Sequence, residues 1–515
     1  MPAPEPTTTP ARARGPLHRF SQLPPARRAA WLIGAIVAFG TVIRIPQLFH
    51  TLNEAYSFRQ TQTAFTVREY AEHGINLFTT PLPVFGPHAS VPMEFPLFQA
   101  IASLFASAGM PADMAARTLG LISFQATAVL LALLLLRWHG RAVAVVGVAL
   151  FELLPYGLLW GASSLIDFMS VALSLLMVLG LERWFNRGSV WWLVVGAVGA
   201  VAGFLVKVTT VPSWGFLVLV SIILVVRRFG WAKSWRRVVI GLAVGPALGF
   251  VGAIAWTLYA DRVKSGLELT SYLTSSNLRS WNFGTFTQRV DPQTYAVILD
   301  RIAQEIAGFG LVGLLVAVLA VIFQRDVKDR ITTLGWLAVA VSGPLVFINL
   351  YFVHAYYLIA VYPAIVAAIA IGGVWAVRRI PAQSWQRSAI AAVAILLLFV
   401  STATSQLGRN NIAQFGTNQQ TPGLSDFLLV ETEPDDLIIL TGCDWDPSFL
   451  FYAHRAGVMF WIGDPQTFWQ DHDVADYDWL YSCDGLADAE SYLPAGWRLE
   501  AQENEQFFEL VKEDN

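Results

Sequence analysis

The sequence predicts a polytopic α-helical membrane protein that ends in a small soluble α/β domain. Three observations predict it: 55% of the 515 residues are hydrophobic and 14% are charged, apolar runs of membrane-spanning length recur between residues 29 and 404, and the residues that follow are acidic. The mean hydropathy is +0.51. Such a composition is typical of a membrane protein and excludes the ordinary soluble classes.

The first 28 residues are predicted to be a disordered cytoplasmic tail. They are rich in Pro, Ala and Thr, a composition that cannot bury a core. No apolar segment of the signal-peptide kind precedes Trp31, so the first hydrophobic span is expected to stay uncleaved.

Residues 29–404 are predicted to form a transmembrane domain of about eleven spans. A helix needs about 20 residues to cross about 30 Å of hydrocarbon. The apolar runs of that order are 29–49, 113–137, 141–160, 163–184, 189–206, 208–226, 238–259, 305–323, 332–350, 356–377 and 387–404. The run 94–108 is shorter and is bracketed by Pro96 and Pro111. We expect an interfacial or re-entrant helix there, with a twelfth crossing as the alternative.

Basic residues set the predicted orientation, because cytoplasmic loops collect Lys and Arg. With eleven spans and a cytoplasmic N-terminus, the inner loops hold more than half of the 34 Lys and Arg residues. A crossing at 94–108 would invert every later loop and remove this bias. The loops 50–93 and 260–304 and the domain at 405–515 are therefore placed outside a bacterial-type inner or plasma membrane.

The tail at 405–515 is predicted to be an extracytoplasmic α/β domain. Asp and Glu far outnumber Lys and Arg in it, and its apolar runs are short. Residues 436–441 and 477–481 predict buried strands. Residues 447–457 predict a helix that Asp446 caps and Gly457 ends.

Cys443 and Cys483, the two cysteines of the chain, each follow one of these strands. If the strands are parallel neighbours, both thiols lie at one edge of the sheet, within the Cα separation of about 4.4–6.8 Å that a disulfide needs. An extracytoplasmic location permits the bond. We expect a disulfide, with two free buried thiols as the alternative.

The membrane region shows no internal repeat, Walker motif, HExxH motif or cluster of metal ligands. Internal repeats are a mark of many secondary transporters. The ionisable side chains that stand out lie at the outer ends of predicted spans, where a charge beside a bilayer needs a functional or pairing reason. They are Glu54, Arg59, Arg68, Glu94, Arg117, Asp167, Lys207 and His354.

Short motifs follow one another along this outer side. They are Asn53-Glu54-Ala55-Tyr56, Phe58-Arg59-Gln60-Thr61-Gln62-Thr63, Glu94-Phe95-Pro96-Leu97, Ala116-Arg117, Ile166-Asp167 and His354-Ala355-Tyr356-Tyr357. Over residues 30–380 their order resembles a bacterial membrane branch of the GT-C superfamily of glycosyltransferases. That superfamily uses polyprenyl-phosphate sugars and includes the protein O-mannosyltransferases and the aminoarabinose transferases.

The chain departs from the family pattern at two positions. The family often has Asp where Asn53 stands, so the resemblance passes the catalytic role to another carboxylate. In the aminoarabinose transferases a Lys precedes the Pro-Pro-Leu element, whereas Glu94 stands here. Phosphate binding therefore does not carry over to that position.

Transfer with inversion needs one carboxylate as base for the acceptor hydroxyl, because a lipid phosphate leaves without protonation near neutral pH. Glu54 is our first choice for this base and Glu94 the second. Either is alternatively a rim residue paired with Arg59 or Arg68. By resemblance Asp167 is a second acid that orients the acceptor or organises cations, and it is alternatively a helix cap.

Cations are expected to hold the donor phosphate, bidentately for Arg and as a point charge for Lys. The candidates are Arg59, Lys207, Arg279 and Arg289. All but Arg59 are alternatively solvated loop charges. The side chains expected to line the substrate cavity are Tyr56, Gln60, His354, Tyr356 and Tyr357. For the last three, an aromatic belt at the headgroup level is the alternative.

We therefore predict an inverting hexosyl- or pentosyltransferase that moves a sugar from a polyprenyl-phosphate donor to a cell-envelope glycan, lipid or protein on the outer face. No cofactor is assigned, a divalent metal stays open, and no nucleic-acid partner is expected. One rival is a transporter or flippase of lipid-linked sugars, whose polar groups would gather at the membrane midplane. The other is a non-catalytic envelope assembly subunit, which would not need Glu54 or Asp167.

Overall fold

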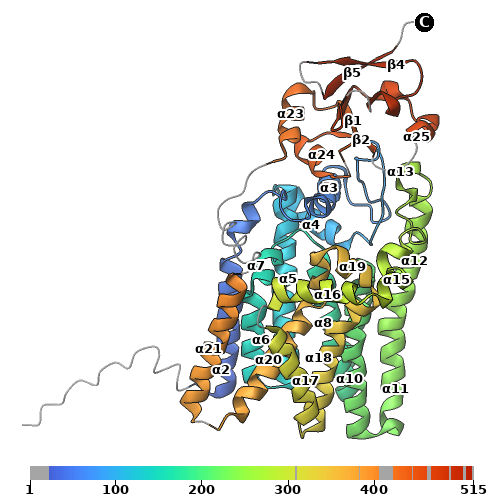
Figure 1. Ribbon diagram of the computed structural model, residues 1–515. Coiled ribbons are helices and arrows are strands. Elements are labelled where there is room, and N and C mark those ends of the chain that lie inside the picture. Colours follow the sequence, from blue (N-terminus) through green and yellow to red (C-terminus); the bar gives the residue numbers. More distant parts are fainter. Residues whose placement is uncertain are drawn as a thin grey trace, which may run out of the picture.

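The computed structural model describes residues 23–307, 310–381, 383–404, 421–443, 445–460, 465–485, 489–502 and 506–512. Long helices run side by side in one bundle, and a small sheet with its own helices covers one end of it (Figure 1). Most of the predicted N-terminal tail lies outside the described residues. Its last residues, from Pro25, already belong to the first helix of the bundle.

Helices make up most of the region up to residue 404. Those of the first half are α2 (Pro25–Val42), η1 (Pro46–Phe49), α3 (Ser57–His73), α4 (Leu97–Ser107), α5 (Ala112–Trp138), α6 (Arg141–Leu153), α7 (Pro155–Trp160), α8 (Asp167–Arg187), α9 (Val190–Val206) and α10 (Val211–Phe229). Those of the second half are α11 (Trp231–Leu242), η2 (Ala243–Ala247), α12 (Leu248–Lys264), α13 (Glu268–Ser271), α14 (Arg279–Phe283), α15 (Phe286–Val290), α16 (Pro292–Arg301), η3 (Ile302–Ala307), α17 (Gly310–Phe323), α18 (Val327–Val346), α19 (Ile348–Val353), η4 (Ala355–Ala360), α20 (Tyr362–Arg379) and α21 (Ser384–Ala403).

Within the described residues, five helical segments are long and apolar enough to cross a membrane, or six if a bent pair around η3 counts as one span. Each of the other predicted spans also contains a helix, but one that does not meet both criteria, so eleven crossings stay a prediction. The 11 residues of α4 make it too short to span about 30 Å of hydrocarbon.

Small residues let α8 and α9 pack closely. A Cβ added at Gly180 would lie 2.4 Å from the backbone nitrogen of Gly196, and one at Gly199 would lie 2.5 Å from that of Met177. Close backbone approach through glycine is typical of helix pairs in membranes. It holds the beginning of α8, at Asp167, against the end of α9, next to Lys207.

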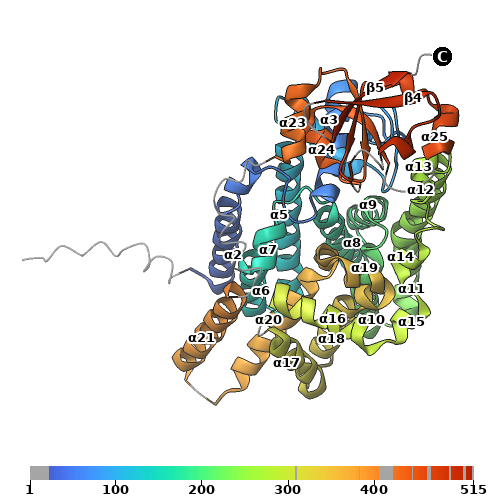
Figure 2. The ribbon, with the colours of Figure 1, turned by 45° about the horizontal axis from the view of Figure 1, so that its top comes forward.

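The C-terminal region contains one sheet in the order β2-β1-β3-β5-β4. Its strands are β1 (Leu437–Thr441), β2 (Ala456–Phe460), β3 (Trp479–Ser482), β4 (Trp497–Ala501) and β5 (Phe507–Lys512). β1 pairs in parallel with both β2 and β3, while β5 is antiparallel to β3 and β4. The helices α23 (Gly423–Glu431), α24 (Ser448–Ala453) and α25 (Pro465–Asp471) flank it (Figure 2).

The parallel neighbours β1 and β3 bring the two cysteines together. Thr441 pairs with Ser482 at the ends of the strands, and Cys443 and Cys483 follow at the same edge of the sheet. They are joined in a disulfide with a Cα separation of 5.1 Å.

The helix predicted for residues 447–457 is shorter than expected. Asp446 Oδ1 accepts from the Ser448 N–H at 3.0 Å, but α24 ends at Ala453 because His454 takes a left-handed conformation with φ 53°. Gly457 lies inside β2 instead of ending a helix. A Cβ there would lie 1.9 Å from the Ile438 carbonyl oxygen, so strand packing explains this glycine.

A segment of the loop that joins α3 to α4 extends the sheet. Gly86 N–H donates to the Gly457 carbonyl at 2.8 Å, Gly457 N–H donates to Pro83 at 3.0 Å, and Met459 N–H donates to Val84 at 2.9 Å. Phe85 and Val458 form an antiparallel bridge. Residues 83–86 thus cover the free edge of β2 and tie the sheet to the loop that precedes α4.

Candidate active site

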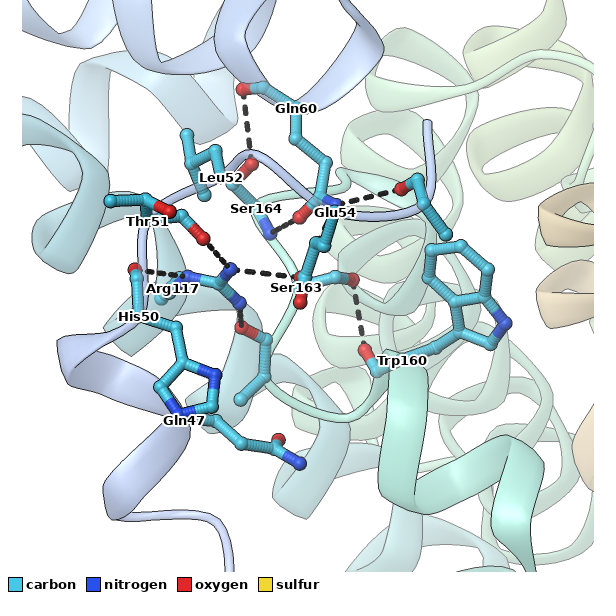
Figure 3. Close-up of polar contacts among 12 residues, drawn as sticks. Gln47, His50, Thr51, Leu52, Glu54, Gln60, Arg117, Trp160, Ser163 and Ser164 are labelled. Carbon is cyan, nitrogen blue, oxygen red and sulfur yellow. Dashed lines mark hydrogen bonds and ion pairs between the residues drawn. The ribbon is translucent and has the colours of Figure 1, made fainter. Parts of the chain in front are cut away.

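The loop before α3 directs Glu54 toward an arginine buried in the bundle (Figure 3). Arg117 of α5 donates Nη2 to Glu54 Oε1 at 2.8 Å. The same guanidinium donates to the carbonyls of His50, Thr51 and Ala162 at 3.1, 2.6 and 3.1 Å. Arg117 is 1% exposed, so it fixes the backbone on both sides of the site instead of anchoring a span at the interface.

Gln60 links the Glu54 loop to the loop that leads into α8 (Figure 3). Its Nε2 donates to the Ala55 carbonyl at 3.0 Å and to Glu54 Oε1 at 3.4 Å. Its Oε1 accepts from the Ser164 N–H at 3.2 Å, and Ser164 Oγ donates to the Gln60 carbonyl at 3.0 Å. Gln60 is therefore held by four hydrogen bonds and holds two loops in register.

Arg59 and Glu94 form an ion pair between α3 and the end of the loop that joins α3 to α4. Arg59 also donates Nη1 to Gln62 Oε1 at 2.7 Å. Burial raises the pKa of Glu94, but the charges of Arg59 and Lys207 outweigh it, so this pKa lies below its ordinary value. Glu94 is consequently an ionised partner of two cations and a weak proton acceptor.

Asp167 and Lys207 form a second pair, in which Lys207 Nζ lies 2.7 Å from Asp167 Oδ1. They are 0% and 5% exposed. Asp167 Oδ2 is buried and has no hydrogen-bond partner in the described part of the chain. The ammonium also lies 4.9 Å from the ring centroid of Tyr357 and 5.4 Å from that of Tyr356, within range of a cation–π contact.

An aromatic wall joins these ion pairs and consists of Tyr56, His354, Tyr356 and Tyr357. The ring of Tyr56, whose backbone is left-handed at φ 58°, lies 5.1 Å from His354 and 5.0 Å from Tyr356. Tyr56 Oη accepts from the Ala355 N–H at 3.0 Å. Tyr356 and Tyr357 stack at 4.4 Å. Residues 354–357 therefore lie between the Glu54 loop and the Asp167–Lys207 pair, which makes one continuous cluster.

The two remaining candidate cations share a cavity of their own. Arg279 and Arg289 line a cavity of about 560 Å³ on the loop that links α12 and α16. Arg289 donates to the carbonyls of Phe283, Leu345 and Val346 at 2.6, 3.1 and 2.7 Å. The last two belong to the final turn of α18, where a cation stabilises a helix end. This structural role accounts for Arg289 without a phosphate.

Three charged residues were not singled out as site candidates from the sequence. Arg301 donates Nη1 to the Tyr351 carbonyl at 3.3 Å and acts electrostatically on Tyr56 and His354. Arg44 and Glu152 form an ion pair at 3.0 Å with both side chains 0% exposed. For Arg44 and Glu152 the available signal was a charged residue well inside the apolar runs 29–49 and 141–160, which is rare without a partner.

The C-terminal sheet domain contacts the start of α3, beside the cluster. Ser57 Oγ donates to Asp446 Oδ2 at 3.1 Å, and the Leu52 N–H donates to Tyr452 Oη. The rings of Phe58 and Trp445 lie 6.3 Å apart. The loop after β1 and the helix α24 thus form one border of the candidate site.

The residues of the cluster do not fit a divalent metal. The carboxylates of Glu54, Glu94 and Asp167 are each already paired with a basic side chain. Among the described residues, the group of potential ligands that lie within 4.8 Å of one another is Glu69, Glu72 and His73, on the partly exposed and exposed side of α3. No catalytic step is therefore derived through a metal.

The chain shares its fold with solved structures of ArnT and of the oligosaccharyltransferase AglB. No protein-family model matches the chain, and no curated protein sequence matches it significantly. Among solved structures, the ArnT protein of Cupriavidus metallidurans bound to undecaprenyl phosphate has a TM-score of 0.60 at 14% identity, over 95% of this chain and 98% of its own.

The oligosaccharyltransferase AglB of Archaeoglobus fulgidus, solved with an inhibitory peptide and a dolichol-phosphate, has a TM-score of 0.51 at 12% identity, over 93% of this chain and 74% of its own. The Archaeoglobus fulgidus oligosaccharyltransferase has also been solved with Zn and sulfate, with a TM-score of 0.52 at 11% identity and coverages of 88% and 67%. At these identities the likeness is one of fold.

Proposed function

We propose that the protein transfers a sugar from a polyprenyl-phosphate donor to a hydroxyl of a cell-envelope glycan, lipid or protein at the outer face of the membrane. One observation carries the proposal. Carboxylate–cation pairs gather around a shared aromatic wall at one end of the bundle. The fold it shares with proteins solved with undecaprenyl phosphate and a dolichol-phosphate supports the same donor class.

In this proposal Lys207 and Arg59 hold the donor phosphate. Lys207 lies over the rings of Tyr356 and Tyr357, and Arg59 interacts electrostatically with the same two tyrosines, so a phosphate that approaches this wall meets two cationic side chains. As the bond between the anomeric carbon and the phosphate oxygen breaks, its electron pair stays on the phosphate. Positive groups fixed before the reaction stabilise that developing charge without reorganisation.

Glu54 is the proposed base that takes the proton of the acceptor hydroxyl while the hydroxyl oxygen attacks the anomeric carbon. Glu94 is the weaker candidate, because Arg59 and Lys207 lower its pKa. The buried Asp167 Oδ2 is a further hydrogen-bond acceptor and is proposed to orient the incoming hydroxyl. Inversion at the anomeric carbon follows from a single displacement.

The test is transfer by the purified full-length protein in lipid vesicles, using a panel of polyprenyl-phosphate hexoses and pentoses and an envelope extract as acceptor. Release of polyprenyl phosphate and appearance of labelled acceptor are measured. Glu54→Gln should abolish both, whereas Glu72→Gln, an exposed change on α3, should leave both intact. Full activity of Glu54→Gln, Glu94→Gln and Asp167→Asn would overturn the proposed site.

Cleavage of a bound donor distinguishes a transferase from a transporter or an assembly subunit. A transporter or an assembly subunit would not release polyprenyl phosphate from any donor, although it would bind one. Wild-type protein that retains undecaprenyl phosphate in native mass spectra, yet never cleaves any sugar of the panel with the acceptor extract, would contradict the transferase.

A further inference from the structure

A second charged cavity lies at the end of the bundle away from the sheet. Its volume is about 740 Å³, and it is bounded by the last turns of α5, α8 and α10 and by the beginning of α18 (Figure 1). The candidate active site lies at the opposite end of the same helices. The predicted orientation places this cavity at the cytoplasmic leaflet.

Positive charge dominates the cavity. Its ionisable lining consists of five cations and two carboxylates, which leaves a formal charge of 5 − 2 = +3. The cations are Arg137, Arg227, Arg228, Arg325 and Lys328. They come from three separate parts of the chain, so the fold, and not one basic sequence run, concentrates them in one hollow.

Both carboxylates of the lining already have structural partners. Glu182 Oε2 forms an ion pair with Arg137 Nε at 2.6 Å, and Glu182 Oε1 accepts from Asn186 Nδ2 at 2.9 Å. Asp326 caps α18, because its Oδ1 accepts from the Asp329 N–H at 3.0 Å. Glu182 is therefore paired with one of the five cations, and Asp326 has a capping role.

Three arginines of the cavity have no carboxylate partner among the described residues. Arg227, Arg228 and Arg325 form no ion pair with a carboxylate of the described part of the chain, and all three are exposed. Like charges gathered in a hollow favour an anionic occupant.

We infer that this cavity binds the phosphate headgroup of an anionic membrane lipid. Arginine forks match phosphate oxygens bidentately, and basic pockets between transmembrane helices at the cytoplasmic side are suited to such headgroups. Apolar side chains of Leu224 and Val327 line the same cavity, which fits an amphiphile better than a free ion. The inference is independent of the proposed transfer reaction.

The test measures retention of dioleoyl phosphatidylglycerol by the full-length protein in native mass spectra, against dioleoyl phosphatidylcholine. Inorganic pyrophosphate is the soluble competitor. Wild-type protein should retain the anionic lipid selectively and show a higher unfolding temperature with it. Arg227→Gln combined with Arg325→Gln should weaken retention roughly tenfold or more, since each basic group near a membrane surface contributes about 1 kcal/mol.

Arg236→Gln combined with Arg378→Gln is the matched control. Both arginines are exposed on α11 and α20 and are outside the cavity lining, and the control also loses two charges. It should retain the lipid as the wild type does. Equal retention by the cavity variant and the wild type would overturn the site, and binding of pyrophosphate without anionic lipid would overturn the lipid as its occupant. Unchanged unfolding of both variants in phosphatidylcholine excludes a folding defect.

Discussion

Lys207 Nζ lies 2.7 Å from Asp167 Oδ1 at the point where α9 ends and α8 begins, and both side chains are buried. Removing two charges from water is costly, and their attraction repays the cost only with good geometry. Here the pair also turns an ammonium toward the rings of Tyr356 and Tyr357. A purely structural ion pair would not need the two tyrosine rings. We therefore expect mutations of this pair to affect ligand binding and protein stability differently.

Lys207→Met should destabilise the protein by about 3–5 kcal/mol, because it leaves Asp167 buried and unpaired. Adding Asp167→Leu should restore most of this loss, since an apolar pair replaces an ionic one at little net cost. Both the single and the double variant should fail to bind undecaprenyl phosphate, because both lack Lys207. Unfolding in detergent and lipid retention in native mass spectra measure the two effects. Recovery of binding together with stability would mean that Lys207 has only a structural role.

Glu54→Gln should lower turnover by roughly 10²–10⁴-fold, the range of general base catalysis, while stability changes little. The amide oxygen of Gln still accepts from Arg117 and Gln60, so the loop keeps its contacts. Arg117→Met should mainly lower stability, by about 3–5 kcal/mol, because the largely buried Glu54 carboxylate loses its cationic partner. Turnover and chemical unfolding are compared for the same preparations. Equal loss of stability in both variants would remove the case for Glu54 as base.

The helical membrane architecture and the disulfide partners could be predicted from the sequence because they rest on local signals. Apolar runs of span length mark helices in lipid, and two cysteines after adjacent parallel strands have one pairing available. The motifs predicted Glu54, Arg59 and Asp167 on one side of the membrane, and the predicted span ends added Lys207 to them. Their pairing could not be predicted, since no sequence spacing relates Glu54 to Arg117 or Asp167 to Lys207 across separate helices.

Two structural features have no local signal. The pairing of residues 83–86 with β2 joins segments that are far apart in the sequence, and backbone hydrogen bonds leave no mark in side-chain patterns. Gly457 was predicted to end a helix because glycine commonly does so. The same residue type also allows close strand packing, and only the position of Ile438 distinguishes the two uses.

His454 should make the contact between the soluble domain and α3 sensitive to pH. Arg68 Nη1 lies 3.3 Å from His454 Nδ1 and donates to the Phe451 carbonyl at 2.7 Å. Burial and then the charge of Arg68 lower the pKa of His454 below its ordinary value. The unfolded state therefore takes up a proton first, and stability falls as the pH drops below about 6.5 toward the lowered pKa.

His454→Asn should flatten this dependence, and Asn tolerates the left-handed backbone at this position. Thermal unfolding between pH 7.5 and pH 5 measures the slope. His88→Asn, at an exposed position, is the control and should keep the wild-type slope. An identical slope in His454→Asn and the wild type would exclude His454 as the titrating group.

Replacing Cys443 and Cys483 together by Ser should destabilise the soluble domain by roughly 2–4 kcal/mol, because the cross-link closes a loop of 40 residues in the unfolded chain. The loop beside it carries Trp445 and Asp446, which contact α3. Reductant should lower the unfolding temperature of the wild type and have no effect on the double variant. An effect of reductant on both proteins would point to a cause other than this bond.

Gly457→Ala should separate the first outer loop from the sheet without touching the site. The new Cβ would lie 1.9 Å from the Ile438 carbonyl oxygen, which is backbone and cannot rotate away, so β1 and β2 must move apart. Gly457 also exchanges hydrogen bonds with Pro83 and Gly86, and those contacts would move with it. We expect a loss of about 1–3 kcal/mol, the usual cost of overpacking, and faster amide exchange at residues 83–86.

Gly423→Ala is the matched control, because nothing lies within 4 Å of its added Cβ and helix α23 gains a better helix former. Unchanged exchange at 83–86 in Gly457→Ala would show that the loop does not depend on the edge of β2 for its position.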